Sequence, residues 1–322
     1  MTRVFVTGAA GFIGSHLVEA LSRRGDEVVG IDNFDPFYPR AMKERNLSEM
    51  GPLSGFTFHE LDLLDAAALR SHLTPDTVLV HLAAKAGVRP SLADPVGYAR
   101  VNVTGTAAVA EAARAAGVSR ILFGSSSSVY GDSSPAPFRE DAAAMDPVSP
   151  YAATKRAGEL LLRSVARIYG FRVATLRFFT VYGPRQRPDL AIHSFTRRMI
   201  EGRTLTLFGD GTQARDYTYC DDIVAGVIAA LEWTERAPVG VEDFNLGGNR
   251  SVPTGAMVEE ISRALGITPT IEWAPMQPGD VQRTAADLSK SGTVLGYAPR
   301  TPFPEGIRRF VAWFREAYGR AN

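Results

Sequence analysis

The sequence predicts an α/β fold in which helices cover both faces of a parallel β-sheet. Three observations lead to this prediction. Short β-branched and aromatic runs alternate with amphipathic helical spans along the first half of the chain. A glycine-rich turn joins the first run, residues 3–7, to the first helical span. Hydrophobic residues make up 45% of the 322 residues, which is enough to bury the core of one large domain or of two lobes.

Charge and cysteine content argue against several classes of protein. The 35 basic residues balance the 35 acidic ones, so no basic excess points to a nucleic-acid or anionic-membrane partner. Cys220 is the single cysteine, which excludes an intrachain disulfide and a cysteine-rich metal site and favours a reducing, cytoplasmic location. The first predicted strand begins almost at Met1, which leaves no room for a signal peptide. Every apolar run is too short to span a bilayer.

The first strand, turn and helix have the order of a phosphate-binding βαβ unit. Gly8, Gly11 and Gly14 are spaced Gly-x-x-Gly-x-x-Gly, and glycines there let the backbone approach a pyrophosphate at the helix N-terminus. The second strand, residues 27–31, ends in Asp32, which follows Gly14 by 18 residues. A carboxylate at this place accepts hydrogen bonds from an adenosine ribose and repels a 2′-phosphate, which favours NAD over NADP. The alternative is a tight turn followed by a helix-capping aspartate.

Later strand ends extend this predicted cofactor site. Residues 57–61 lead to Asp62 and Leu63, which are placed to touch an adenine. A second buried-looking run, residues 77–82, continues into the small residues Ala83 and Ala84, over which a cofactor can lie. Ligands bind at the carboxyl ends of the strands in doubly wound sheets. We therefore predict a Rossmann-type doubly wound parallel sheet whose strand ends meet in one crevice.

A tyrosine and a lysine form the candidate catalytic pair. Tyr151 and Lys155 open an Ala- and Leu-rich helical run, and their spacing puts both side chains on one face of the helix. An ammonium beside a phenol favours the phenolate, so the tyrosine can act as a base nearer neutral pH. A hydroxyl of the serine run 125–128 can share the proton of a substrate alcohol. The spacing alone fits a buried tyrosine beside a solvated lysine equally well, but Ser126 falls at a strand end like the cofactor residues, and this convergence favours catalysis.

Together these motifs resemble the extended short-chain dehydrogenase/reductase family. The matching segments are residues 7–14, Asp32, residues 81–84, residues 125–131 and Tyr151-x-x-x-Lys155. The resemblance continues to about Phe314 and is greatest to the nucleotide-sugar 4-epimerases, particularly the UDP-glucuronate 4-epimerases. The stretches that support this narrower resemblance are residues 35–38, 86–91, 177–184, 187–189 and 277–281.

Two departures from related enzymes narrow the implied chemistry. Sister dehydratases carry an acidic pair within the serine/threonine run, where Ser127 and Ser128 stand in this chain. The elimination chemistry of those enzymes therefore lacks its acid and base here. UDP-galactose 4-epimerases usually carry an arginine where Gln277 stands, so contact with the substrate diphosphate rests more on Arg215.

The second half of the chain predicts a smaller C-terminal α/β substrate lobe, because the regular alternation gives way to shorter elements and a Pro- and Gly-rich loop. We predict that residues 1–183 and 215–245 form the NAD-binding Rossmann domain and that residues 184–214 and 246–322 form the UDP-sugar-binding lobe. The five histidines show no ligand spacing, so we predict no metal.

The resemblance assigns roles within this lobe. Arg187 faces the C6 carboxylate of the sugar, since an arginine fork matches a carboxylate bidentately, whereas Arg185 is expected to be solvated. Residues 205–209 flank the uracil, Arg215 contacts the diphosphate and Asp280 reaches the uridine ribose. The implied substrate-binding residues are Arg89, Ser126, Ser128, Tyr151, Thr180, Arg187, Thr206, Phe208, Arg215 and Asp280. The implied catalytic residues are Tyr151, Lys155, Ser126, Ser127 and Ser128. The implied cofactor-binding residues are Gly8, Gly11, Phe12, Ile13, Gly14, Asp32, Asn33, Asp62, Leu63, Leu82, Ala83, Ala84, Lys85, Asn102, Tyr151, Lys155 and Phe178.

The activity implied by the resemblance is that of an NAD-dependent 4-epimerase, which interconverts UDP-glucuronate and UDP-galacturonate through a 4-keto intermediate. Tyr151 removes the 4-OH proton, Ser126 orients that hydroxyl, and NAD takes and returns the C4 hydride. Lys155 lowers the pKa of the tyrosine and holds the nicotinamide ribose, while Arg187 and Thr180 keep the carboxylate from leaving. The alternatives are a UDP-glucose/UDP-galactose 4-epimerase, a UDP-glucuronate decarboxylase and a catalytically silent NAD-binding sensor. Helices near residues 95–115 and 152–168 are expected to pair in a homodimer, as in related enzymes.

Overall fold

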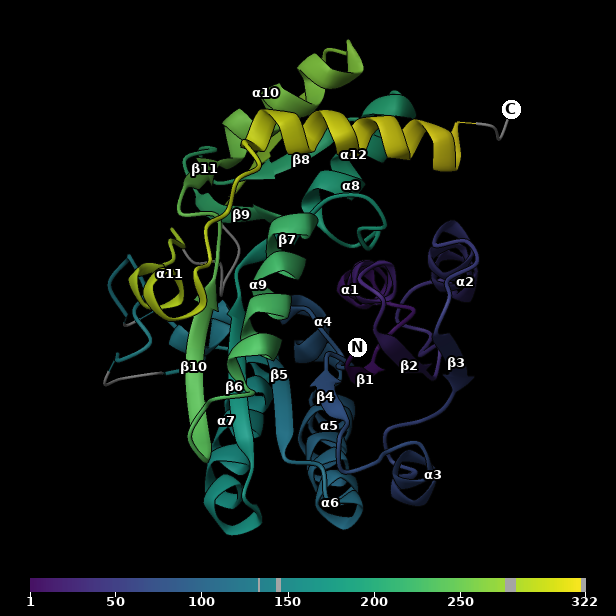
Figure 1. The fold of residues 1–322 in the computed structure, drawn as a ribbon. Coiled ribbons are helices and arrows are strands. Elements are labelled where there is room, and N and C mark those ends of the chain that lie inside the picture. The colour runs from purple at the N-terminus through teal and green to yellow at the C-terminus, as the bar shows by residue number, and fades with distance from the viewer. Residues whose placement is uncertain (133, 143–145, 276–281, 320–322) are drawn as a thin grey trace.

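A seven-stranded parallel sheet forms the centre of the larger lobe (Figure 1). The structure is a computed structural model and describes residues 1–132, 134–142, 146–275 and 282–319. The strands of the sheet are β1 (Arg3–Thr7), β2 (Glu27–Asp32), β3 (Phe56–Glu60), β4 (Val78–His81), β5 (Arg120–Ser126), β6 (Arg172–Phe178) and β10 (Gly240–Leu246). Their order is β10-β6-β5-β4-β1-β2-β3. The order reverses between β1 and β4, and the carboxyl ends at such a switch point are where ligands bind.

Side-chain alternation along the strands divides the core between two helical layers. Val4 and Val6 of β1 pack in the same cluster as residues of α1 (Phe12–Arg23) and α9 (Cys220–Trp233). Phe5, between those two valines, points to the other face and packs with residues of the opposite layer. That layer contains α3 (Ala66–Ser71), α6 (Gly105–Ala116) and α7 (Pro150–Tyr169), while α2 (Arg40–Glu49) lies beside α1. The predicted doubly wound α/β fold is therefore confirmed.

The connection from β4 to β5 carries additional short helices. α4 (Val88–Ala93) and α5 (Pro95–Ala99) lead through a π-helical turn, Arg100–Thr104, into α6. Asp94 caps α5 by accepting a hydrogen bond from the Gly97 N–H at 2.9 Å. Both short helices pack against α7, and the Tyr98 ring meets the Tyr151 ring edge-on, with 6.3 Å between their centroids.

The smaller lobe lies over the carboxyl end of the sheet (Figure 1). It contains β7 (Thr180–Tyr182), β9 (Ala214–Tyr219) and β11 (Ser251–Pro253) in one sheet and β8 (Leu205–Phe208) with β12 (Ile271–Ala274) in another. Its helices are α8 (Ala191–Ile200), α10 (Thr254–Leu265) and α12 (Phe303–Tyr318), whereas α11 (Ser289–Leu295) packs against α9 and β10 of the larger lobe. One hydrophobic cluster runs from the large sheet into this lobe.

Side-chain contacts also join the two lobes. The indole N–H of Trp313 in α12 donates to Glu49 of α2 at 3.0 Å, and the Arg45 guanidinium lies over the Tyr318 ring. β10 joins the large sheet. β7 and most of β9 pair in a small sheet although the prediction assigns them to the larger lobe. The division into lobes at the predicted residues stays a prediction.

Within the described part of the chain, no helix has both the length and the apolar character that a membrane crossing requires.

Candidate active site

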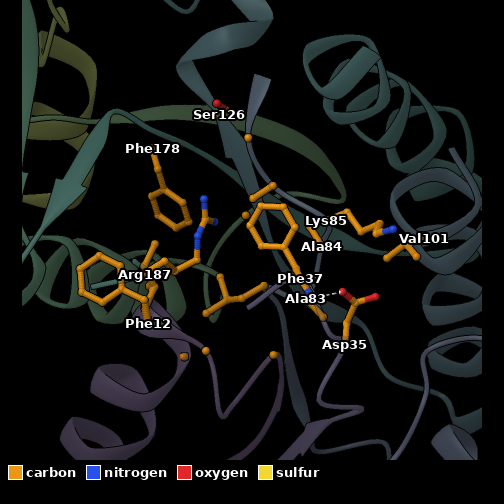
Figure 2. Close-up of a pocket in the computed structure, with 18 of the residues that line it drawn as sticks. Phe12, Asp35, Phe37, Ala83, Ala84, Lys85, Val101, Ser126, Phe178 and Arg187 are labelled. Atoms are coloured by element: carbon orange, nitrogen blue, oxygen red, sulfur yellow. Dashed lines mark hydrogen bonds between the residues drawn. The ribbon is translucent and has the colours of Figure 1, made fainter. Parts of the chain in front are cut away.

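A cavity of about 450 Å³ runs along the carboxyl ends of β1, β2, β4 and β5 (Figure 2). The glycine turn and Asp32 line one end, and Ser126, Tyr151 and Lys155 line the other. We call it the cofactor cavity. The predicted cofactor residues that line it are Gly8, Gly11, Phe12, Ile13, Gly14, Asp32, Asn33, Asp62, Leu63, Leu82, Ala83, Ala84, Lys85, Tyr151, Lys155 and Phe178.

The glycine turn leaves no room for a side chain at Gly8 or Gly14. Gly8 has a φ of +75°, and a Cβ there would lie 2.9 Å from the backbone nitrogen of Ala83. A Cβ on Gly14 would lie 2.0 Å from the Gly8 carbonyl oxygen. The N-cap residue of α1 is Gly11, which provides no side-chain cap. The first N–H groups of α1 thus meet the cavity without a capping side chain, which suits an anionic group such as a pyrophosphate.

Polar side chains at the ends of β2 and β3 are held by partners distant in sequence. Asp32 is only 5% exposed, and its Oδ1 accepts hydrogen bonds from the Phe34 N–H at 2.8 Å and the Lys43 ammonium at 3.0 Å. The Asn33 amide donates to Asp62 at 2.8 Å. Lys43 was not predicted as a partner of Asp32, because nothing in its spacing from Asp32 marks it. The sequence feature that could have predicted this contact is a lysine on the inner face of a short helix.

Asn102 is a predicted cofactor residue that is not among the residues lining the cofactor cavity. It is buried behind the wall, where its Oδ1 accepts from the Lys85 N–H at 2.8 Å and its amide donates to the Lys85 carbonyl at 2.9 Å and to Thr154 at 3.0 Å. It therefore fixes the backbone of residue 85 against α7. The Lys85 ammonium pairs with Asp94 at 2.7 Å.

Tyr151 and Lys155 project from the first turns of α7 into the cavity. Ser149 caps this helix by accepting from the Ala152 N–H at 3.2 Å, and Pro150 takes a first-turn position. Burial raises the pKa of Tyr151, while a hydrogen bond with Ser126 and the positive charge of Arg187 act to lower it. These two groups favour the phenolate.

The Lys155 ammonium is fixed at the end of β5, and its effect on the Tyr151 pKa stays a prediction. It donates a hydrogen bond to the Gly124 carbonyl at 2.7 Å. Burial lowers the pKa of Lys155 to about 8, and Glu159 acts in the opposite direction. Lys155 is therefore anchored to the end of β5, and Arg187 also places a positive charge near Tyr151.

The serine run turns at the end of β5. The Ser126 Oγ accepts from the Ser128 N–H at 3.1 Å and caps the 3₁₀ turn Ser127–Tyr130. Ser126, Ser127 and Ser128 all line the cavity. The Ser125 hydroxyl instead donates to buried Glu159 at 2.7 Å. The serines closest to the Tyr151 phenol are thus held by a local cap.

A second cavity of about 440 Å³ lies between the lobes, and we call it the nucleotide cavity. Four predicted substrate residues line it: Arg89, Thr206, Phe208 and Arg215. The Arg89 guanidinium lies over the Phe208 ring, 5.3 Å from its centroid. Thr180, Arg187, Ser126, Ser128 and Tyr151 line the cofactor cavity instead. Asp280, Gln277 and the rest of residues 277–281 lie outside the described residues.

Arg187 connects the two cavities. Its side chain enters the cofactor cavity (Figure 2), where its guanidinium lies 5.3 Å from the centroid of the Phe37 ring. Its Nε and Nη2 donate to the two carboxylate oxygens of Asp189 at 3.0 and 2.8 Å, and Asp189 lines the nucleotide cavity. Asp189 lies within the 187–189 motif, but no role was predicted for it.

The expectation that Arg185 is solvated is wrong. Arg185 is 9% exposed, and its guanidinium pairs with Glu19 at 2.8 Å and Glu49 at 3.2 Å. Glu19 of α1 and Glu49 of α2 reach Arg185 because both helices pack beneath the loop that carries it. Arg185 therefore joins the two lobes.

One further group of possible metal ligands is present among the residues that the structure describes. Potential ligand atoms of His16, Cys220 and Asp221 lie within 4.8 Å of one another. Burial and the nearby positive charge of Arg185 lower the pKa of His16, and burial raises that of Cys220. These surroundings do not favour a cation, and the absence of a metal stays a prediction.

Comparisons with known proteins agree with this geometry. Residues 4–247 match the model of the NAD dependent epimerase/dehydratase family. A UDP-glucuronate 4-epimerase of Thermodesulfobacterium geofontis is 39% identical over 97% of this chain and 95% of its own length. A crystal structure of the UDP-glucuronic acid 4-epimerase from Bacillus cereus, in complex with UDP-glucuronic acid and NAD, is 37% identical with a TM-score of 0.91, covering 98% of this chain and 100% of that one.

A UDP-glucose 4-epimerase of Thermotoga maritima, solved with UDP-glucose, is also similar, at 31% identity and a TM-score of 0.88 over 98% of this chain and 99% of that one. The family match covers more than half of the chain and includes the glycine turn, the serine run and the Tyr151–Lys155 pair. The chain therefore belongs to the NAD dependent epimerase/dehydratase family.

Proposed function

We propose that this protein is an NAD-dependent 4-epimerase that interconverts UDP-glucuronate and UDP-galacturonate. The observation that carries the proposal is the meeting of Tyr151, Ser126 and Arg187 in one cavity, at the opposite end from the glycine turn. This arrangement places a base, a hydroxyl donor and a carboxylate-binding fork around the position where a sugar can lie. The similar UDP-glucuronate 4-epimerases support the choice of substrate.

The cofactor cavity fits NAD. Because Gly8 and Gly14 have no side chains, the turn packs tightly against neighbouring backbone. The pyrophosphate can therefore approach the N-terminus of α1. Asp32 would hold the adenosine ribose, and Asp62 with Leu63 would border the adenine. When bound, NAD supplies a hydride acceptor at C4 of the sugar and returns the hydride to either face of the C4 ketone.

Tyr151 would take the proton of the 4-OH group and give it back after inversion. Ser126 is hydrogen-bonded to the tyrosine, so it can orient the 4-OH towards the phenolate oxygen. General-base catalysis of this kind contributes roughly 10²–10⁴-fold. Because the same tyrosine serves both directions, the proton does not have to leave the cavity.

Arg187 and Thr180 would hold the sugar carboxylate. A β-keto acid loses carbon dioxide when its carboxylate bond aligns with the carbonyl, so a fixed carboxylate protects the 4-keto intermediate. The uridine diphosphate would extend into the nucleotide cavity, with Phe208 beside the uracil and Arg215 near the diphosphate. Arg187 lies where the two cavities meet, which suits a group next to the sugar.

The deciding experiment incubates purified protein with UDP-glucuronate without added NAD and separates the products. UDP-galacturonate is the expected product, because the cofactor is regenerated in each cycle and stays bound. A UDP-pentose as the main product would identify a decarboxylase instead. Binding of NAD without any conversion of UDP-sugars would identify an NAD-binding sensor.

A second activity on UDP-glucose and UDP-galactose is supported by the similar UDP-glucose 4-epimerase structure. It is also supported by Asp189, which already balances the charge of Arg187. Supplying UDP-galactose and measuring UDP-glucose tests this activity directly.

We also propose that the protein forms a homodimer in the cytoplasm. Val96 of α5 and Leu160 and Ile168 of α7 are exposed apolar side chains, and their burial against a second copy would remove them from water. The single cysteine, Cys220, is compatible with a reducing compartment. Light scattering of the purified protein tests the dimer.

A further inference from the structure

Asp189 stands at the boundary between the two cavities. Its carboxylate binds the side-on edge of the Arg187 guanidinium, formed by Nε and Nη2. An arginine presents five N–H donors in a rigid plane, so the end-on edge of Arg187, which includes Nη1, stays available to a ligand in the cofactor cavity. Among the described residues, Arg187 forms an ion pair with Asp189.

The charge of this pair matters more than its hydrogen bonds. Arg187 has a side chain that is 18% exposed, and that of Asp189 is 33% exposed. A guanidinium that loses water to a bound sugar needs a compensating charge. A uronate brings its own carboxylate, whereas a neutral hexose brings none. In the second case Asp189 is the group that keeps Arg187 paired.

We propose that Asp189 determines how strongly the site distinguishes acidic from neutral UDP-sugars, because its carboxylate balances the charge of Arg187. The proposal rests on the function proposed above for the same site. With Asp189 present, the pair is neutral and a carboxylate on the sugar gains less from Arg187. When the Asp189 charge is removed, Arg187 attracts an acidic sugar more strongly. Next to a neutral sugar, Arg187 is then a cation without a compensating charge.

The substitution Asp189→Asn tests this inference, since asparagine keeps the shape and one acceptor oxygen while removing the charge. Calorimetric dissociation constants for UDP-glucuronate and UDP-glucose are measured in the Tyr151→Phe background, so that no turnover interferes. We expect the preference for UDP-glucuronate over UDP-glucose to rise about tenfold, as expected for one unit charge near a partly buried pair. Equal changes for both sugars, or a smaller preference, would overturn the proposal.

Asp210→Asn provides the matched control. Asp210 belongs to the same lobe, is exposed and bonds locally to Thr212, so its loss changes the net charge equally without touching Arg187. The preference between the two sugars should stay at the wild-type value. If Asp210→Asn changes the preference as much as Asp189→Asn, the effect comes from net charge and the proposal fails.

A pH profile separates a charge effect from a structural one. The groups that face Tyr151 are Lys155 on its own helix, Ser126 of β5, Tyr98 of α5 and Arg187 of the smaller lobe. Removing the Asp189 charge strengthens the field of Arg187 at the phenol, so the acidic limb of kcat/KM should move to lower pH in Asp189→Asn. The measurement uses whichever UDP-sugar the wild-type enzyme converts, so a failed glucuronate assignment does not affect it. A limb that stays in place would overturn the charge-balance explanation.

Discussion

The two cavities differ in how their walls are built. The adenosine end of the cofactor cavity is formed by neighbouring strands of one sheet, and its polar groups are already paired, Asp32 with Lys43 and Asn33 with Asp62. The nucleotide cavity is formed where two lobes meet, with Arg89 of α4 lying against Phe208 of β8. Hydrogen-bonded strands keep fixed distances, whereas two lobes can shift relative to each other. We therefore expect a preformed, retained cofactor site beside a substrate site that adjusts.

Tyr151 lies at the end of the cofactor cavity that Arg187 enters, and its substitution should have the largest effect. Tyr151→Phe should reduce turnover by at least about 10²-fold, because the general base is lost, while NAD content and UDP-sugar binding stay near normal. Product analysis, cofactor absorbance after denaturation and calorimetry measure these quantities. Undiminished product formation would remove Tyr151 from the mechanism. Loss of NAD would show that the two ends of the cofactor cavity are not independent.

Arg187 tests the substrate side of the comparison. Arg187→Ala should reduce UDP-glucuronate turnover about 10²-fold, because a charge-assisted pair with the carboxylate is lost. It should affect UDP-glucose turnover little, if that sugar is used, and it should increase the decarboxylated fraction. Arg187→Lys should not restore the wild-type rate, since an ammonium cannot form the bidentate pair. Equal losses for both sugars would mean that Arg187 supports the loop or the nucleotide. A lower NAD content would show that the cofactor site depends on the substrate site.

Burial of Lys155 in the cofactor cavity should make the stability of the fold depend on pH. Burial lowers its pKa from 10.5 to about 8, so between these values the unfolded chain binds more protons than the folded one and stability rises with pH. Relative to Lys155→Met, the wild-type protein should gain about 2 kcal/mol of unfolding free energy between pH 8 and pH 9.5. Urea unfolding of both proteins at several pH values measures this difference. Parallel pH dependences would show that the ammonium is not desolvated.

Asp32 should give the smallest of these effects. Asp32→Asn keeps an acceptor for the Phe34 N–H but loses the charge, so NAD binding should weaken about tenfold and the discrimination against NADP should fall. Glu60→Gln is the matched control, because Glu60 ends the neighbouring strand in register with Asp32 but is exposed and paired with Arg40. Fluorescence titration with both cofactors measures the preference. An unchanged preference in Asp32→Asn would contradict the ribose assignment.

The sequence by itself predicted the features whose residues are contiguous or lie at regular spacing. The glycine turn, the strand that ends in Asp32 and the Tyr151–Lys155 pair each depend on local backbone geometry, and local geometry follows from residue type and spacing. The parallel sheet followed from the alternation of strands and helices. The family resemblance placed Arg187 and Phe208, which spacing alone did not.

The tertiary structure decided which distant groups face one another. Lys43 beside Asp32, Asn102 behind the cavity wall and Arg185 between Glu19 and Glu49 all depend on how helices pack on the sheet. It also brought Arg187 of the smaller lobe to Tyr151, where the positive charge acts to lower the pKa of the phenol, while the Lys155 ammonium is held by the Gly124 carbonyl. Charges act through space over distances that sequence separation does not encode, so their pairing became visible only once the chain was folded.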